Sequence, residues 1–93
     1  MLHLRREVNE GFYVGEDLVK FTGLTRSTGR ASMTLNGSPL NMDRGGQIHL
    51  GEAVVWFTKT QIGNQSGNLQ AVFSIDAPSS VSILREELAE DSE

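Results

Sequence analysis

The feature that most constrains the fold of this 93-residue chain is an internal repeat. Residues 12–22, Phe-Tyr-Val-Gly-Glu-Asp-Leu-Val-Lys-Phe-Thr, match residues 48–58, Ile-His-Leu-Gly-Glu-Ala-Val-Val-Trp-Phe-Thr, at an offset of 36 residues. Five residue types are identical at matched places, and nearly every other apolar residue meets another apolar one. Repetition at a fixed offset indicates that one structural unit occurs twice.

The repeat resumes after a turn, where residues 31–37 match residues 71–77 at an offset of 40. The second copy therefore has the longer hairpin loop, residues 63–68, against Ser27-Thr28-Gly29 in the first. Both loops contain glycine or asparagine, which tight reversals favour. Apolar residues alternate in the matched segments and should face a core, which is typical of half-buried strands: Ala31, Met33, Leu35, Ala71, Phe73 and Ile75.

These patterns predict an all-β fold with a short C-terminal helix, made from two pseudo-symmetric copies. We expect one domain, 1–93, with an internal repeat of approximately 1–44 and 40–93, because a chain of this length has room for one core. The helix is predicted over 85–91. The predicted strands cover 2–7, 11–15, 18–25, 30–35, 40–43, 47–50, 53–61, 69–76 and 81–84.

The net charge of −4 argues at first against binding to nucleic acid, because cationic side chains dominate contacts to phosphate. Five of the twelve acids lie in the last eight residues, however, so residues 1–85 carry eight bases against seven acids. Because the charges of residues 1–85 nearly balance, any binding to nucleic acid should depend on a few well-placed arginines and on recognition of unpaired bases, and not on a large positively charged surface.

The chain has no cysteine, which excludes disulfides, thiolate metal sites and a cysteine nucleophile. It also has no long apolar run and no apolar stretch after its N-terminal residues. We therefore expect a cytoplasmic protein without a membrane segment.

Both ends of the chain resemble the carbon storage regulator (CsrA/RsmA) family. Residues 76–88, Asp-Ala-Pro-Ser-Ser-Val-Ser-Ile-Leu-Arg-Glu-Glu-Leu, resemble that family's Asn-Ala-Pro, two residues, Val-Ser-Val-His-Arg-Glu-Glu-Ile. Residues 1–10, Met-Leu-His-Leu-Arg-Arg-Glu-Val-Asn-Glu, resemble its opening strand, Met-Leu-Ile-Leu-Thr-Arg-Arg-Val-Gly-Glu. Residues 13–17 and 46–52 each resemble its second-strand element, so the likeness covers almost the whole chain.

The resemblance implies a chain that builds the family's intertwined dimer alone, as about one and two-thirds copies. In that family the first strand of one protomer is expected beside the fifth strand of the other in a shared sheet. Residues 40–43 would serve both as the fifth strand of copy one and as the start of copy two. The helix of copy one would be missing, since Gly45 and Gly46 oppose it.

The family binds GGA in RNA hairpin loops, and its binding residues map here onto Leu4, Arg6, Ala77, Pro78 and Arg85. An arginine fork suits phosphate or a guanine edge, and main-chain groups beside a proline can read an unstacked base. The alternative for Arg85 is a surface ion pair with Glu86 or Glu7.

A possible weak second RNA site comprises Asn36, Gly37 and Arg44, but it has no partner first strand with its own arginine. Two departures affect the first site. Glu7 replaces the family's second arginine, where a carboxylate repels phosphate, and Leu84 replaces its histidine. Arg5 and Arg6 are neighbours on a strand, so only one of them can face a given ligand.

Other features point to structural roles. His3 and His49 lack the spaced carboxylates of a metal site. Trp56 and Phe57 face opposite ways, so one can stack on RNA bases while Phe57, which matches Phe21, packs in the core. The glycine-rich segments lack the context of phosphate-binding loops, and no catalytic triad is evident. We expect neither an enzyme nor a cofactor or metal.

The sequence thus predicts an RNA-binding regulator of translation, recognising GGA in hairpin loops of mRNA or small RNA, with a monomer slightly favoured over a homodimer. The alternative is a related protein without RNA affinity that acts by protein association, for example as an antagonist of a true regulator. Sheet edges left open by the missing strand would serve that role.

Overall fold

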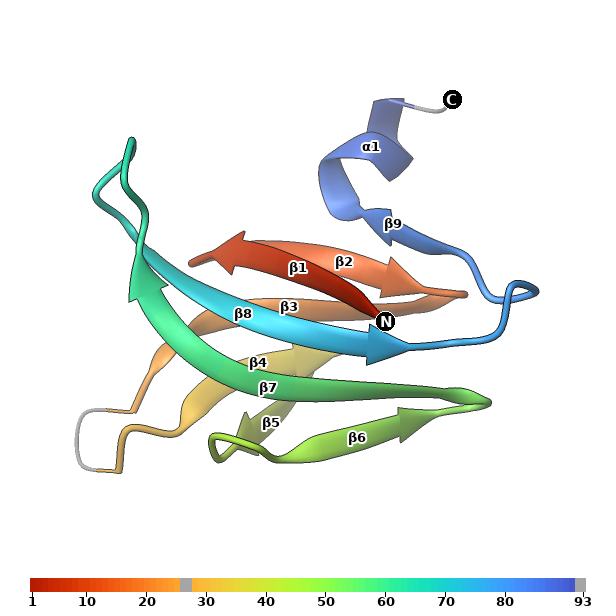
Figure 1. Cartoon of the computed structure of the whole chain (residues 1–93), viewed down its shortest axis with the longest axis horizontal. Coiled ribbons are helices and arrows are strands. Elements are labelled where there is room, and N and C mark those ends of the chain that lie inside the picture. Colours follow the sequence, from red (N-terminus) through yellow and green to blue (C-terminus); the bar gives the residue numbers. More distant parts are fainter. Residues whose placement is uncertain (26–27, 92–93) are drawn as a thin grey trace.

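Two antiparallel sheets and one short helix make up the structure, a computed structural model that describes residues 1–25 and 28–91 (Figure 1). Ser27 of the predicted loop and Glu93 of the acidic tail lie outside these ranges. The elements are β1 (Leu2–Glu7), β2 (Glu10–Val14), β3 (Asp17–Leu24), β4 (Ala31–Leu35), β5 (Ser38–Met42), β6 (Gln47–Leu50), β7 (Ala53–Ile62), β8 (Leu69–Asp76), β9 (Ile83–Arg85) and α1 (Glu86–Asp91).

The mostly β fold is confirmed, with each strand within about two residues of its prediction. Sheet A has the strand order β1-β8-β7-β6, and sheet B has the order β5-β4-β3-β2-β9. Every strand pairing in both sheets is antiparallel, which is one of the two arrangements, antiparallel or mixed, that the family resemblance implies. In the described part of the chain, no helix has the length and apolar character needed to cross a membrane.

The two sheets share one pairing pattern. The β2–β3 hairpin turns at Gly15 (φ 61°), and the β6–β7 hairpin turns at Gly51 (φ 63°). Both glycines have the left-handed conformation that two-residue hairpin loops require. The register shifts in β3 and β7 also correspond, since they follow Phe21 and Phe57, which are 36 residues apart.

The fourth strand of each pattern matches as well. β1 pairs with β8 through Leu2↔Ile75 and Leu4↔Phe73. β5 pairs with β4 through Ser38↔Leu35 and Leu40↔Met33. β5 therefore occupies the place next to β4 that β1 occupies next to β8. From the sequence, residues 40–43 are expected to be both the fifth strand of copy one and the start of copy two; β5 has the place that corresponds to β1, and it lies in a different sheet from β6.

The sheets face each other across one apolar core. Alternation sends every second side chain inward. The four phenylalanines Phe12, Phe21, Phe57 and Phe73 are among the largest buried side chains. Phe73 lies between the other sheet's Phe12, with ring centroids 5.2 Å apart, and Phe57 of its own sheet, at 6.0 Å. The core residues are Leu4, Phe12, Val14, Val19, Phe21, Ala31, Met33, Met42, Ala53, Val55, Phe57, Ala71, Phe73 and Ile75.

The sheets differ at one edge. In sheet B, β9 covers β2 through the pairs Phe12↔Arg85, Tyr13↔Leu84 and Val14↔Ile83. In sheet A, the matching strand β6 pairs with β7 alone, so its other edge is open within the described residues. Phe12 and Val14 are 0% and 2% exposed, whereas their counterparts Ile48 and Leu50 are only half-buried, because nothing equivalent to β9 covers them.

Replacing Phe73 with Ala should lower the free energy of unfolding by about 3–5 kcal/mol, since it removes the ring that joins the two sheets. Urea denaturation followed by circular dichroism measures this change. The neighbouring Val72→Ala, on the outer side of the same strand and half-buried, should cost much less. Equal losses for the two variants would contradict the placement of Phe73 at the centre of the core.

Candidate nucleic-acid interface

The two segments that carry the sequence motifs meet although they are more than seventy residues apart. β1 is the outermost strand of sheet A, and β9 is the outermost strand of sheet B. The segment 77–82 joins the end of β8 to the start of β9, and α1 follows β9 directly. A pocket of about 260 Å³ at the start of α1 is lined by Arg6, Asn9, Glu10, Gly11, Lys20, Glu86 and Glu87. We give the name β1–β9 groove to this pocket together with the neighbouring β9 edge and the segment 77–82.

The expectation that the first and fifth strands share a sheet is wrong, because β1 pairs with β8 and β9 pairs with β2. Side chains join the two edges instead. Arg6 reaches from β1 to the carbonyl of Gly11 in β2, with Nη1 donating over 3.1 Å, and to Glu87 in α1, with Nη1 2.7 Å from Oε1. An ion pair between β1 and α1 thus forms part of the lining of the groove.

Arg6 is held almost entirely inside the protein, with 5% of its surface exposed. Its Nε donates to the carbonyl of Arg5, and its Nη2 lies 3.8 Å from a carboxylate oxygen of Glu10. A buried guanidinium needs such partners, since an unpaired charge away from water is costly. The inward direction follows from alternation, because Leu4 of the same strand also points into the core.

Glu87 is the anionic partner, and half of its side chain is exposed. Hydrogen bonds from Arg6 hold the pKa of this carboxyl below its ordinary value, with smaller contributions from a backbone hydrogen bond and from the charges of Arg6 and Arg85. Burial acts in the opposite direction. Since Arg85 contributes to this shift, its positive charge also lies near the end of the groove.

The other predicted site residues have different environments. Leu4 is a core residue with 6% exposure, and Ala77 is partly buried against the core. Pro78 is exposed, and its carbonyl accepts a hydrogen bond from the amide of Val81 over 2.9 Å, which closes a turn. Arg85 is exposed, and the salt bridges of the described side chains involve Arg6, Lys20 and Arg30 but not Arg85.

Glu7 does not face the groove as a free carboxylate. Its Oε2 accepts from the hydroxyl of Ser66 over 3.0 Å, and its Oε1 accepts from the side-chain amide of Asn68 over 3.2 Å. These hydrogen bonds, with the Asn68 contribution largest, lower the pKa of Glu7. The longer loop of the second copy therefore binds the residue that departs from the family pattern.

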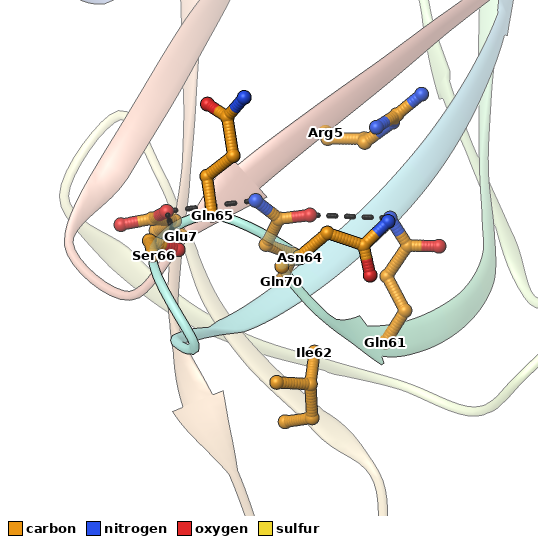
Figure 2. Close-up of a pocket in the computed structure, with 9 residues that line it drawn as sticks. Arg5, Glu7, Gln61, Ile62, Asn64, Gln65, Ser66 and Gln70 are labelled. Atoms are coloured by element: carbon orange, nitrogen blue, oxygen red, sulfur yellow. Dashed lines mark hydrogen bonds between the residues drawn. The ribbon is translucent and has the colours of Figure 1, made fainter.

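A polar pocket of about 510 Å³ adjoins this contact at the end of sheet A (Figure 2). Gln70 links Glu7 to Gln61 across three strands, because its amide donates to Glu7 over 3.5 Å and its carbonyl accepts from Gln61 over 3.1 Å. The remaining lining residues include Arg5, Ile62, Asn64 and Gln65. The pocket offers amide donors and acceptors and the guanidinium of Arg5, which forms no salt bridge within residues 1–25 and 28–91.

The residues of the predicted second site are not brought together. Asn36 (φ 52°) and Gly37 (φ 87°) form the β4–β5 turn, where the Asn36 side chain accepts from the amide of Leu18 and donates to Asp17. Arg44 is exposed beyond the other end of β5. Since the whole strand separates them, the arrangement serves the hairpin and offers no second groove.

Sequence reasoning missed the partners of Arg6 and Glu7. The inward position of Arg6 could be predicted from the sequence, because Arg6 is two residues from Leu4 on the same strand and both point to the same side. Glu87 and Asn68 gave no such signal, since each pairing depends on how a distant segment folds back.

Replacing Glu87 with Gln should lower the free energy of unfolding at pH 7 by about 1 kcal/mol, after allowance for screening at a half-exposed group. Because the folded-state pKa is lowered from 4.5, this contribution is present above that value and is lost as the pH falls through the lowered pKa. Urea unfolding of both proteins at pH 7 and at about pH 3 tests it. The difference should become smaller in acid than at pH 7, while Glu16→Gln, in an exposed turn, serves as the control. A difference independent of pH would contradict the ion pair.

Comparison with known proteins identifies no relative. No family model, no curated protein and no solved structure matches this chain. The functional argument therefore rests on the motifs at the two ends of the chain and on the geometry of the groove that joins them.

Proposed function

We propose that this protein binds single-stranded RNA with GGA in a hairpin loop at the β1–β9 groove and so represses or remodels translation of chosen messages in the cytoplasm. One observation carries the proposal: the two segments that resemble the binding segments of carbon storage regulators provide an edge strand of each sheet, β1 and β9, and are linked by the ion pair of Arg6 in β1 with Glu87 in α1, which directly follows β9. In sequence these segments are at opposite ends of the chain.

The shared pairing pattern supports a further element of the proposal, that the chain is two fused copies of one unit. Matched registers in β2–β3–β4 and β6–β7–β8, with β1 and β5 in equivalent places, are what two such copies would give. The open edge of β6 marks the place of the missing fifth strand of copy one. A second groove would need that strand, so we propose one RNA site per chain.

The chemistry of the groove suits a flexible, unpaired ligand. Exposed Arg85 offers a planar fork of donors to phosphate or to the O6 and N7 atoms of guanine. The adjoining turn at Pro78 exposes main-chain groups that can read the edge of a splayed base. In the proposed complex, RNA phosphate replaces Glu87 as the partner of Arg6, which makes Glu87 an internal competitor of RNA.

Titration of a labelled hairpin with GGA in its loop tests this proposal, beside a hairpin in which GGA is disrupted. Arg85→Ala should weaken binding about 5-fold to 150-fold, corresponding to loss of one good base contact of about 1–3 kcal/mol, and should reduce the preference for GGA. Glu87→Gln should strengthen binding, because it removes a carboxylate and frees Arg6.

Arg30→Ala provides a charge-matched control, since Arg30 pairs with Asp43 away from the groove and its loss should leave selectivity unchanged. Equal, weak binding of both hairpins by the unaltered protein would refute the proposal. Unchanged binding by Glu87→Gln would limit the groove contacts to Arg85.

A second candidate function, association with a regulator of the same family, is favoured by the open edge of β6. The amide of Phe57 donates to the carbonyl of Gly46, so alternation directs the main-chain amide and carbonyl groups of Ile48 and Leu50 toward β7. The main-chain groups of Gln47 and His49 then point to the open side. Since β9 covers the matching edge of β2, the occupant we expect is a fifth strand of such a regulator, added by antiparallel pairing.

Sedimentation of the purified protein with a purified regulator of this family tests that association. His49→Pro removes one edge amide but no bond to β7, and it should abolish the complex. His49→Ala keeps the amide and should retain it. Failure of the unaltered proteins to associate would remove this candidate.

A further inference from the structure

The outward side of sheet A carries a set of residues that the groove does not use. Strand registers align them in rows across the sheet. One row contains His3, Ser74, Trp56 and Gln47. The next row contains Arg5, Val72 and Lys59. We call these seven residues the outer face of sheet A. The face is opposite to the core, since His3, Arg5, Trp56 and Val72 each alternate with buried neighbours. The strand registers place Gln47, Ser74 and Lys59 in the same rows, where Ser74 is itself buried.

Trp56 is at the middle of this face on the long strand β7 and is half-buried. Hydrogen bonding fixes one of its neighbours in the row, because His3 Nδ1 lies 2.9 Å from the hydroxyl of Ser74. Arg5 and Lys59 are both exposed in the adjoining row. An exposed side of an antiparallel sheet with an aromatic ring in one row and two cations in the next is an arrangement on which unpaired bases can stack while their phosphates are neutralised.

The matching side of sheet B shows that the fold alone does not produce this set. At the places equivalent to His3, Arg5, Trp56 and Lys59 it carries Pro39, Asn41, Lys20 and Gly23.

The helix α1 also occupies part of that side of sheet B. Lys20 Nζ pairs with Glu86 over 3.4 Å, and a Cβ placed on Gly11 would lie 3.2 Å from the Glu86 carboxylate. The side of sheet A has no such helix in the described part of the chain. The outward side is therefore partly covered by α1 in sheet B, whereas in sheet A it carries an aromatic ring and two cations without a covering helix among the described residues.

The polar pocket continues the face at one end (Figure 2). Arg5 belongs to both, and the next row of the sheet, Glu7, Gln70 and Gln61, forms part of its lining. Its volume falls in the range of about 300–1,000 Å³ that ligand sites have. Amide side chains such as Gln65 and Asn64 donate and accept hydrogen bonds in the way that base edges require.

Neutral hydrogen-bond donors hold the carboxylate of Glu7 at the pocket end of the face, which fixes its position and leaves its negative charge in place. Both of its oxygens accept hydrogen bonds from the 63–68 loop or from β8. Asp76, the other carboxylate on this side of the sheet, is beside Val54 at the far corner. Arg5 and Lys59 therefore dominate the charge of the middle rows.

We propose that the outer face of sheet A binds a single-stranded segment of RNA without strict sequence preference, with one base stacked on Trp56, phosphates on Arg5 and Lys59, and a following base in the polar pocket. The choice of RNA as the ligand rests on the proposed function, because the single-stranded segment would flank the RNA hairpin bound in the groove. The surface itself is separate, since Arg5 and Arg6 point to opposite sides of β1.

Trp56 is the single tryptophan of the chain, so its fluorescence reports on this face directly. An oligouridylate of about eight nucleotides, within the range that stacking sites occupy, should quench it in a saturable way. The affinity should fall with salt with a slope of about −1.4 in log–log form for two phosphate contacts to a single strand. The double variant Arg5→Ala/Lys59→Ala should lose most of this slope and at least about 10-fold in affinity.

Trp56→Leu, followed by anisotropy of the labelled oligouridylate, should weaken binding about 5-fold or more, whereas Trp56→Phe should restore much of it because a ring remains. Asn41→Ala, at the place in sheet B equivalent to Arg5, is the matched control and should have no effect. Absence of quenching, or equal quenching by inorganic polyphosphate, would overturn the inference.

The two proposals fail separately. Selective binding of the GGA hairpin with unaltered Trp56 fluorescence would support the groove and overturn the outer face. Saturable quenching by oligouridylate without preference for GGA would support the outer face and refute the groove.

Discussion

The contact of Phe73 with Phe12 and Phe57 is the interaction on which the rest of the structure depends. It joins the two sheets, since Phe12 belongs to sheet B and the other two rings to sheet A. It also sets the register of the groove, because Leu4 of β1 pairs with Phe73 and Arg85 of β9 pairs with Phe12. The strands that carry the candidate RNA contacts are thus positioned by the residues packed most deeply in the core.

The unequal ends of the two sheets explain where surface is available. In sheet B, β9 covers the edge of β2, and α1 reaches Lys20 and Gly11 beside it. In sheet A, neither cover is present in the described residues, so Ile48 and Leu50 remain half-buried and no helix covers the outward-facing Trp56. The difference between the two sheets therefore leaves one edge and one face of sheet A uncovered where sheet B has β9 and α1.

The sequence predicted the strands and the core because both follow from local alternation and from the repeat. The alternating apolar residues of 31–35 and 71–75 are inward, and Phe57 packs in the core as its match to Phe21 indicated. The family resemblance brought together β1 and β9, but it placed them in one sheet, which the pairing contradicts. Strand partners in a two-sheet fold depend on non-local contacts, and no periodicity in a single sequence reports them.

The site was predicted less well for a physical reason. Leu4 and Arg6 are two residues apart on β1 and point to the same side, so the packing that buries Leu4 also buries Arg6. A buried guanidinium requires an anionic partner, and here α1 supplies it as Glu87. In the proposed complex, phosphate must displace Glu87 in a chain whose net charge is −4. A ligand that offers phosphate alone gains little by that exchange, because one anion replaces another. Base contacts at Arg85 and the Pro78 turn must then supply the remainder, so the internal competition favours specific loops over non-specific backbone binding.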